Sequence, residues 1–374
     1  MQLFHTSDWH LGRMLYGRSL LEDQRHFLEE QFLPAVEEER PACVLLAGDL
    51  YDRQVAPPEA IALLDRTLSR LVELEVPVCA IAGNHDGPSR IAILKSALRR
   101  AGVYLATQLE DAFAPVTIEQ GGQAVQVFLL PYFDTAQARD FLGDETLKGE
   151  NACMEALLYR MLPLFAPGAA HVLVAHCFAA GSQTCDSESV ALVGGSGQVS
   201  PGLFEAFDYV ALGHLHGPQK AGEKARYSGS PLKYSIDEAG QKKGFLTLTW
   251  DGTAMAAELR PTRPLRDVGR LTGQFQDLLA RGEASPCQDY VELVLEDQEP
   301  VLLAAERLRP YYPNLLSVSH PKAFAMATAG QRAAKLQNQD QATVFASFLK
   351  DVCQIEPEEE DLALFREMRM EVAP

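Results

Sequence analysis

Nearly all of the histidine and aspartate residues that follow predicted strands fall in five short segments. These segments are Asp8-Trp9-His10, Gly48-Asp49, Gly83-Asn84-His85-Asp86, His176 and Gly213-His214-Leu215-His216. Together they offer carboxylate, imidazole and amide groups, a mixed nitrogen and oxygen donor set that suits Mn, Fe or Zn better than Ca or Mg. The sequence therefore predicts a metal centre assembled from distant parts of the chain.

Taken singly, each segment has an ordinary structural explanation. An aspartate after a strand commonly caps a turn, Gly-Asp is common turn chemistry, and a His-x-His sequence can lie on the two faces of an edge strand. Their joint occurrence, each at the end of a predicted strand, favours a shared site. Gly48, Gly83 and Gly213 precede the candidate ligands, and glycine lets a strand end turn sharply and pass close to a metal.

The elements that must position these residues alternate over the first two-thirds of the chain. Apolar runs predict buried strands at Leu3–His5, Cys43–Ala47, Val78–Ala82, Val125–Leu130, His171–Ala175 and Tyr209–Leu212. Helical patterns lie between them at Ser19–Glu39, Pro58–Leu74, Ser89–Ala101 and Asn151–Leu164. This alternation indicates an α/β layered domain, and such sheets bind their ligands at the carboxyl ends of strands. The loop of residues 177–202 is either a substrate-contacting loop or a solvated connector.

A second, smaller domain is predicted where the pattern changes near residues 261–264. Its strands are expected at Leu265–Thr272, Tyr290–Glu296 and Leu315–Ser319, and its helices at Gln274–Arg281 and Val301–Tyr311. From residue 323 an Ala/Gln-rich linker leads to two short amphipathic helices. Their apolar stripes comprise Phe345, Phe348, Leu349 and Val352 in the first and Leu362, Phe365 and Met368 in the second.

The bulk composition narrows the class of protein. A length of 374 residues suggests one large domain with one or two smaller ones, and a hydrophobic fraction of 47% is that of a globular protein. No apolar run is long enough to cross a bilayer and no secretory signal is visible, so we expect no membrane association. Seven cysteines without CxxC spacing suggest reduced thiols in a cytoplasm. The net charge of −18 argues against nucleic-acid binding through a broadly basic surface and predicts reliance on a partner.

The five segments, in their context, resemble the calcineurin-like metallophosphoesterases and, more closely, the SbcD family of bacterial DNA nuclease subunits. The resemblance is carried by residues 5–12 (HTSDWHLG), 47–52 (AGDLYD), 82–90 (AGNHDGPSR), 207–216 (FDYVALGHLH) and 227–235 (YSGSPLKYS). It covers about residues 1–250 strongly, and the remainder agrees in layout. One departure is Ala175 before the lone histidine, where the family often has glycine.

The resemblance implies an α/β fold, a four-layer metallophosphoesterase β-sandwich flanked by helices, with a small α+β capping domain and C-terminal helices. The implied domains are a nuclease domain at 1–260, a capping domain that shapes DNA access at 261–322, and a linker with two partner-docking helices at 323–374. The docking residues would be Phe345, Phe348, Leu349, Val352, Leu362 and Phe365.

The family's residue roles can be carried onto this sequence. Two divalent cations, Mn²⁺ with Mg²⁺ as the alternative, are expected in two ligand groups that share a bridging Asp49. The first group is Asp8, His10 and His216, and the second is Asn84, His176 and His214. His85 would face the scissile phosphate as a charge stabiliser or general acid, and Asp86 would orient its ring.

The resemblance also implies partners. No Walker sequence occurs in this chain, so ATP use would belong to an SbcC-like, SMC-type ATPase with a coiled coil. The family forms homodimers within a heterotetramer, and the helices at Pro58–Leu74 and Ser89–Ala101 are candidates for that contact. Candidate DNA contacts near the motifs are Arg13, Arg53, Arg90 and Lys233, although solvated surface charge is the commoner role of any one such residue.

Three functions fit the motifs. The first is a DNA nuclease subunit, an endonuclease on single strands or hairpins and an ATP-dependent 3′–5′ exonuclease on duplex ends, in DNA repair, recombination or replication. The second is a phosphodiesterase or phosphatase for a small phosphodiester or a phosphoprotein, because fold and metals are shared across the superfamily. The third is an inactive scaffold, against which the complete ligand set argues. The C-terminal regions favour the nuclease.

Overall fold

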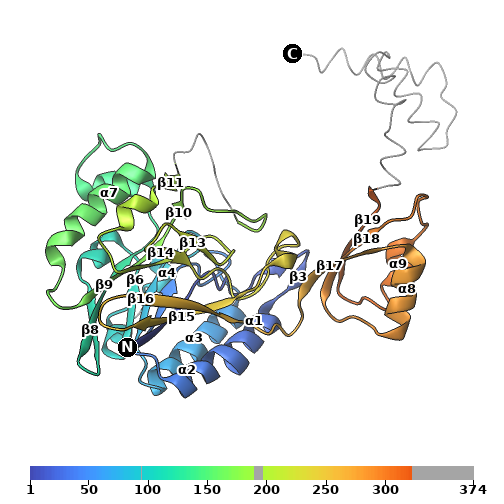
Figure 1. Cartoon of the computed structure of the whole chain (residues 1–374), viewed down its shortest axis with the longest axis horizontal. Helices are drawn as coiled ribbons and strands as arrows, with labels where there is room; N and C mark the ends of the chain where they lie inside the picture. Colours follow the sequence, from blue (N-terminus) through green and yellow to red (C-terminus); the bar gives the residue numbers. More distant parts are fainter. Residues whose placement is uncertain (94, 189–196, 322–374) are drawn as a thin grey trace, which may run out of the picture. The chain divides into compact units, whose positions relative to one another are not determined.

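The computed structural model describes residues 1–93, 95–188 and 197–321 (Figure 1). The chain divides into two compact units, the first made of residues 1–270 with 288–291 and the second of residues 271–287 with those from 292 onward. The apolar stripes expected between residues 345 and 368 lie outside the described residues. No helix within the described ranges is long and apolar enough to span a membrane.

The first unit contains two six-stranded sheets. The first sheet has the order β16 (Met255–Pro261), β15 (Gly244–Trp250), β1 (Gln2–Thr6), β4 (Cys43–Ala47), β5 (Val78–Ile81), β6 (Val103–Ala106). The second sheet has the order β13 (Gln219–Ala221), β14 (Ala225–Tyr227), β12 (Tyr209–Gly213), β9 (Ala170–His176), β8 (Gln123–Leu130), β7 (Val116–Gln120). The six strands predicted from apolar runs are therefore confirmed, three in each sheet.

Parallel pairing brings the ends of these strands together. β1, β4, β5 and β6 are mutually parallel, and so are β8, β9 and β12. Strands buried on both faces are apolar throughout, which explains why they were visible as continuous runs. Their carboxyl ends, followed by the polar segments, meet at one edge of each sheet.

Apolar side chains on both faces of each sheet build a four-layer core. Leu45 and Ile81 of the first sheet pack with Val172 and Val174 of the second between the two sheets. The alternate positions of β9, such as Leu173, face a separate cluster formed with α6 (Thr135–Leu142) and α7 (Gly149–Met161). The alternation follows from the two-residue period of a strand.

The first sheet is covered by the predicted N-terminal helix, which is continuous but changes its winding. It comprises α1 (Leu21–Phe27), a π-helical turn at Leu28–Phe32 and α2 (Leu33–Glu39), and α3 (Pro58–Glu73) lies beside α2 (Figure 1). The Phe4 ring of β1 lies 6.3 Å from the Phe32 ring. The layers are thus helix, sheet, sheet, helix, which confirms the expected fold class.

One predicted helix was wrong. Residues 89–101 form two short helices, α4 (Pro88–Ile91) and α5 (Lys95–Arg100), and neither buries a side chain. Most of the stability of a helix in a protein comes from packing of its apolar face. Because neither α4 nor α5 buries a side chain, packing does not stabilise a single longer helix over residues 89–101. The predictions also missed β15, β16, β6, β7 and α6. The remaining short strands are β2 (Met14–Leu15), β3 (Arg18–Ser19), β10 (Phe178–Ala179) and β11 (Gln198–Val199).

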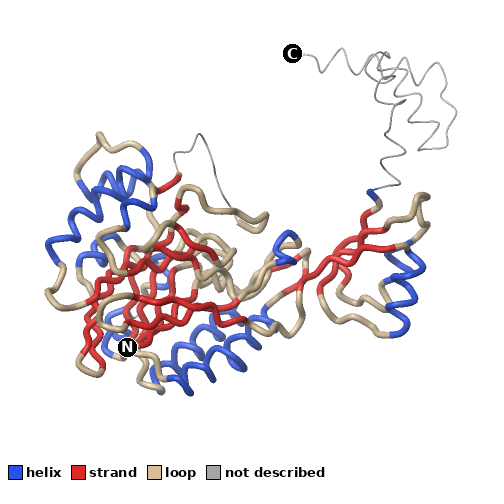
Figure 2. Tube along the Cα trace, viewed as in Figure 1, coloured by secondary structure: helices blue, strands red, loops and turns tan. Residues whose placement is uncertain are grey.

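The second unit contains helices and strands in a small α+β arrangement. Its elements are α8 (Phe275–Ala284), α9 (Ala304–Leu308), β19 (Leu315–Ser319) and the later parts of β17 (Val268–Gly273) and β18 (Tyr290–Leu295), whose first residues belong to the first unit. The strands form one sheet in the order β17-β18-β19. Figure 2 draws strands in red and helices in blue. Phe275, Leu278, Leu308 and Tyr312 are buried in its core, where the Tyr312 hydroxyl donates to the carbonyl of Leu278 at 2.8 Å.

Candidate metal centre

The five polar segments converge in the first unit, at the ends of β1, β4, β5, β9 and β12. The Nε2 atoms of His10 and His216 lie 3.1 Å apart, and His176 Nε2 lies 2.9 Å from Asn84 Oδ1. Asp49 Oδ2 lies 3.4 Å from both His10 Nε2 and His176 Nε2. Asp49 therefore occupies the position between two groups of donor atoms.

Each group is compact enough to hold a cation. Ligand atoms of Asp8, His10 and His216 lie within 4.8 Å of one another, and so do those of Asp8, Asp49 and His176. His214 joins the second group through Nδ1, 3.2 Å from Asn84 Oδ1. The structure brings together all seven residues predicted as ligands.

Several of the candidate ligands themselves have strained backbone conformations. Asp8, His10, Asp49 and His214 have φ angles of 51°, 44°, 51° and 104°, in the region that L-residues rarely adopt. Such conformations persist only where the surrounding structure enforces them, and they cluster at functional sites. The turns that end β1, β4 and β12 are thus locally destabilised by their backbone conformation, and this conformation positions the side chains of the site.

Two glycines next to the site are required by close approach. A Cβ added at Gly83 would lie 2.2 Å from Asp49 Oδ1, and one at Gly213 would lie 1.8 Å from the carbonyl oxygen of Ala47. Neither contact is possible for a larger residue. These positions let the loops after β5 and β12 pass against β4, as expected from the sequence.

Burial and mutual charge set the protonation of the site. Burial lowers the pKa of His10 well below its ordinary value and that of His214 to about 3. Burial raises the pKa of Asp8 to about 7, with a further contribution from the neighbouring Asp49. Burial also disfavours charge on His176, but the adjacent Asp49 carboxylate outweighs it and raises its pKa to about 9. Neutral imidazoles beside buried carboxylates are the state in which these groups bind a cation.

The donor set fits divalent cations. Asp8, His10, Asp49, His176 and His216 are buried and His214 is partly buried. Their ligand atoms converge, and cysteine Sγ atoms take no part in the donor groups found among the described residues. The buried carboxylates of Asp8 and Asp49 lie close together, and their negative charge needs a compensating cation or proton. Cys43, Cys79, Cys153, Cys177 and Cys185 are buried thiols outside any disulfide.

His85 sits beside the donor groups, but its ring is held differently from the expectation. Its Nδ1 lies 2.8 Å from the backbone oxygen of Asp52, and its ring centroid is 4.7 Å from that of His10. Asp86 instead accepts hydrogen bonds from the backbone N–H groups of Leu50, Tyr51 and Gly83. The prediction that Asp86 orients the His85 ring is therefore corrected: Asp52 orients the ring and Asp86 braces the loop.

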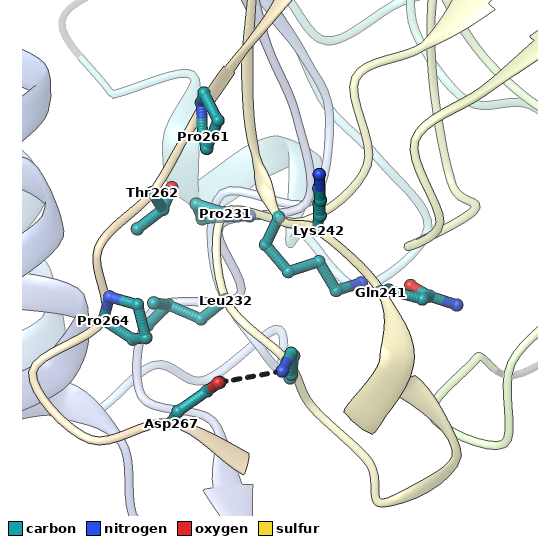
Figure 3. Close-up of a pocket in the computed structure, with 10 residues that line it drawn as sticks. Pro231, Leu232, Gln241, Lys242, Pro261, Thr262, Pro264 and Asp267 are labelled. Atoms are coloured by element: carbon teal, nitrogen blue, oxygen red, sulfur yellow. Dashed lines mark hydrogen bonds and ion pairs between the residues drawn. The ribbon is translucent and has the colours of Figure 1, made fainter. Parts of the chain in front are cut away.

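Two of the four candidate DNA contacts are engaged within the chain. Arg13 donates to Asp52 Oδ1 and to the carbonyl of Ser187, each at 2.9 Å. Lys233 is 10% exposed and pairs with Asp267, Nζ–Oδ1 2.9 Å, in the cavity of Figure 3. Arg53 and Arg90 are exposed. The internal ion pairs could not be read from the sequence, because their partners come from distant segments.

Sequence reasoning missed the groups that hold the ligands in place. Ser7 donates to Asp8 Oδ2 at 2.5 Å, and Ser187 Oγ lies 2.6 Å from His216 Nδ1. Glu238 is fully buried, and although burial disfavours its charge, contacts with His216 and Lys243 hold its pKa well below the usual range. The only signals were the serine-rich loop around Ser187 and the position of Glu238 soon after the 227–235 motif.

The layered fold and its paired donor groups define a metallophosphoesterase. The family model of calcineurin-like phosphoesterase matches residues 1–218, and that of the type 5 capsule protein repressor C-terminal domain matches residues 262–352. The SbcD subunit of the SbcCD nuclease of Staphylococcus epidermidis is 31% identical over 361 residues, which cover 94% of this chain and 93% of that protein. A solved structure from Thermus thermophilus has a TM-score of 0.41 and 13% identity, covering 69% of this chain and 98% of that one.

The chain belongs to the SbcD family of calcineurin-like phosphoesterases. It is accordingly a metal-dependent phosphodiester hydrolase. The resemblance inferred from the short motifs is confirmed over nearly the whole length of the chain.

Proposed function

We propose that this chain is the DNA-cleaving subunit of an SbcCD-type complex and that it hydrolyses DNA phosphodiesters with two divalent cations. The observation that carries the proposal is the convergence of Asp8, Asp49, His176 and His216 around one buried centre. The Staphylococcus epidermidis relative, which is named as a nuclease subunit of SbcCD, supports it. The partner would be an SbcC-like ATPase. The chain alone would cleave single strands and hairpins, and with the partner it would digest duplex ends 3′–5′ in an ATP-dependent manner.

The seven converging residues would be shared between two cations. Asp8, His10 and His216 would hold the first cation, Asn84, His176 and His214 the second, and Asp49 both. Bound cations of this kind neutralise a phosphodiester and lower the pKa of a water molecule. Mn²⁺ suits the mixed nitrogen and oxygen set better than Mg²⁺, which prefers oxygen ligands and retains water.

His85 supplies the proton chemistry. Because the Asp52 carbonyl can only accept, His85 Nδ1 keeps its proton and Nε2 is the ring nitrogen free to exchange one with substrate. Protonated at Nε2, the ring donates to the leaving oxygen or stabilises charge on the phosphoryl oxygens. Asp49 Oδ1 accepts the backbone N–H of His85 at 2.9 Å, so the same residue fixes the acid and the ligand groups.

The regions beyond the metal centre complete the proposal. The second unit would act as a capping domain that shapes DNA access. The segment beyond residue 323 would dock on the partner, and a homodimer of this chain would form the core of a heterotetramer. In support, the second family model extends from residue 262 to residue 352. Arg53 and Arg90, both exposed, remain the proposed DNA contacts.

The decisive experiment compares the wild type with Asp49→Ala on hairpin DNA in Mn²⁺, in Mg²⁺ and in EDTA. We expect Mn²⁺-dependent cleavage that the substitution abolishes. A cyclic nucleotide and a phosphoprotein serve as competing substrates in the same series. Cleavage in EDTA, or turnover of either competing substrate well above that of DNA, would contradict the proposal.

A further inference from the structure

His216 is held at three separate atoms by residues that the proposed function does not use. Its ring Nδ1 lies 2.6 Å from Ser187 Oγ, and its backbone N–H donates to Glu188 Oε1 at 2.5 Å. Its carbonyl accepts from Lys243 Nζ at 2.6 Å. His216 is 2% exposed and Ser187 is 8% exposed, so water does not compete for these bonds.

The contacts continue behind Ser187 into a buried ion pair. Ser187 Oγ donates to Glu238 Oε1 at 2.5 Å, and Glu238 Oε2 pairs with the Lys243 ammonium group. Glu238 Oε1 also accepts from Ser235 Oγ at 2.8 Å and from the backbone N–H of Tyr234 at 3.3 Å. These neighbours all donate to the Glu238 carboxylate, which fixes it as an acceptor.

This arrangement determines where the His216 proton lies. A serine hydroxyl has one proton, and Ser187 gives it to the Glu238 carboxylate. Ser187 Oγ can therefore only accept from His216 Nδ1, which must carry the imidazole proton. The lone pair is left on Nε2, the atom that lies 3.1 Å from His10 Nε2 in the first donor group.

The Nδ1 atom of His216 faces the side chain of Ser187, which lies outside the donor groups, whereas His214 Nδ1 faces Asn84 Oδ1, itself a member of the second donor group. For His176, Nδ1 lies 2.9 Å from the backbone oxygen of Ala47, a group that mutation cannot remove. Within the described residues, His10 Nδ1 has no hydrogen-bond partner, and Asp52 Oδ1 is 3.7 Å away. His216 is therefore the ligand whose orientation a substitution outside the donor groups can test.

We propose that Ser187 and Glu238 are positioning residues of the metal centre, which hold His216 as the Nδ1–H tautomer with its Nε2 lone pair directed to the cation shared with Asp8 and His10. The inference rests on the proposed function in taking His216 as a ligand. Hydrogen bonds to the second nitrogen of a ligand histidine commonly change metal affinity by about 10- to 100-fold. Ser187 thereby acts through His216 and does not touch the reacting atoms.

The test is Mn²⁺ binding and turnover in Ser187→Ala, with Ser187→Thr as the conservative variant. Titration calorimetry should show one of two Mn²⁺ sites weakened roughly 10-fold or more in Ser187→Ala, and close to wild type in Ser187→Thr. Cleavage by Ser187→Ala should recover at high Mn²⁺, because the affinity and not the chemical step is changed. Ser235→Ala, which loses a contact to Glu238 but none to His216, is the matched control and should bind Mn²⁺ as the wild type does.

A second measurement needs no change at Ser187. In the metal-free wild type, nitrogen-detected NMR of the histidine rings, assigned with His216→Gln, should show His216 protonated at Nδ1 alone. A folded Ser187→Ala with unchanged Mn²⁺ affinity, or a wild-type His216 protonated at Nε2, overturns the inference while leaving the nuclease proposal intact. A wild type that binds no Mn²⁺ overturns both.

Discussion

The Nε2 atoms of His10 and His216 face each other at 3.1 Å inside a buried site, with Asp49 Oδ2 3.4 Å from the first of them. Burial lowers the pKa of both rings, so both are neutral near pH 7. With the His216 proton on Nδ1, the His216 Nε2 lone pair, His10 Nε2 and a carboxylate oxygen approach one point. A divalent cation is the partner that such a point requires.

Cation binding should therefore stabilise the folded chain. At a Mn²⁺ concentration of about 100 times the dissociation constant, the gain is about 2.7 kcal/mol. For a protein of this size that corresponds to a rise in melting temperature of roughly 3 °C. Thermal unfolding in EDTA and in Mn²⁺ measures the rise. Asp49→Ala, which removes the proposed bridging ligand, should lose most of this rise, whereas the exposed Asp251→Asn should keep it. Equal shifts in all three proteins would count against the assigned ligands.

His85 offers a separate test, because the proposed function gives it a role in proton transfer and not in cation binding. His85→Gln should lower the rate of DNA cleavage roughly 100-fold or more, the usual contribution of a general acid. Its Mn²⁺ affinity and melting temperature should stay near those of the wild type. Single-turnover cleavage at saturating Mn²⁺ gives the rate, and calorimetry gives the affinity. Loss of Mn²⁺ binding in this variant would instead make His85 a ligand.

The site residues that come immediately after a strand in the chain could be recognised in the sequence. Cys43–Ala47 and Tyr209–Leu212 are apolar because both faces of their strands are buried, and the polar residues just beyond them must lie at the sheet edge. The fold class and all seven converging ligand candidates could therefore be predicted.

The partners of those residues could not be predicted. Whether Asp52 or Asp86 faces His85 depends on how the loop after β5 turns, which one sequence does not state. Ser187 and Glu238 are 51 positions apart, and only folding joins them. In the same way, the charge of Lys233 suggested a DNA contact, while the structure pairs it with Asp267. Side-chain partners of this kind are set by tertiary packing and not by local pattern.

The packing of the loop after β5 against the Asp49 carboxylate can be tested at Gly83. In Gly83→Ala, the new Cβ would lie 2.2 Å from Asp49 Oδ1 and 2.4 Å from the Asp49 backbone nitrogen. Forcing extra carbon into a packed site costs about 1–3 kcal/mol, and here it also displaces a cation ligand. We expect a lower urea midpoint and little Mn²⁺-dependent cleavage. Gly269→Ala, whose Cβ would meet nothing within 4 Å, should leave both unchanged; a similar loss there would point to a general effect of alanine.

Glu150, which is not a candidate metal ligand, should make the stability of the folded protein depend on pH. Burial, followed by the nearby Asp134, raises the pKa of Glu150 to about 7 from 4.5. Between these values the folded protein binds the proton that the unfolded chain has lost, so this group's contribution to stability falls as pH rises. Glu150→Gln removes the effect, and its urea midpoint relative to wild type should increase from about pH 5 to about pH 8. The exposed Glu205→Gln should show the same relative midpoint at both pH values, and a constant difference for Glu150→Gln would contradict the assignment.

Variants of Arg13 and Arg53 should distinguish an arginine that positions site residues within the chain from one that binds DNA. Arg13 joins Asp52, which holds the His85 ring, to Ser187, which holds His216, so Arg13→Lys should weaken both. Lysine cannot reproduce a guanidinium that donates to two acceptors from separate nitrogens. We expect roughly 10-fold slower cleavage, both of hairpin DNA and of a small substrate such as bis(p-nitrophenyl) phosphate, from loss of these positioning contacts.

Arg53 is exposed and should behave in the opposite way. Arg53→Ala should leave hydrolysis of the small phosphodiester unchanged, because that substrate does not reach beyond the metal centre. Its KM for DNA should rise, and the dependence of log affinity on log salt should lose a slope of about 1, which corresponds to one phosphate contact. If Arg13→Lys slows cleavage of DNA but not hydrolysis of the small phosphodiester, Arg13 contacts the DNA substrate directly. In that case the contacts that link His85 to His216 through Arg13 do not set the rate.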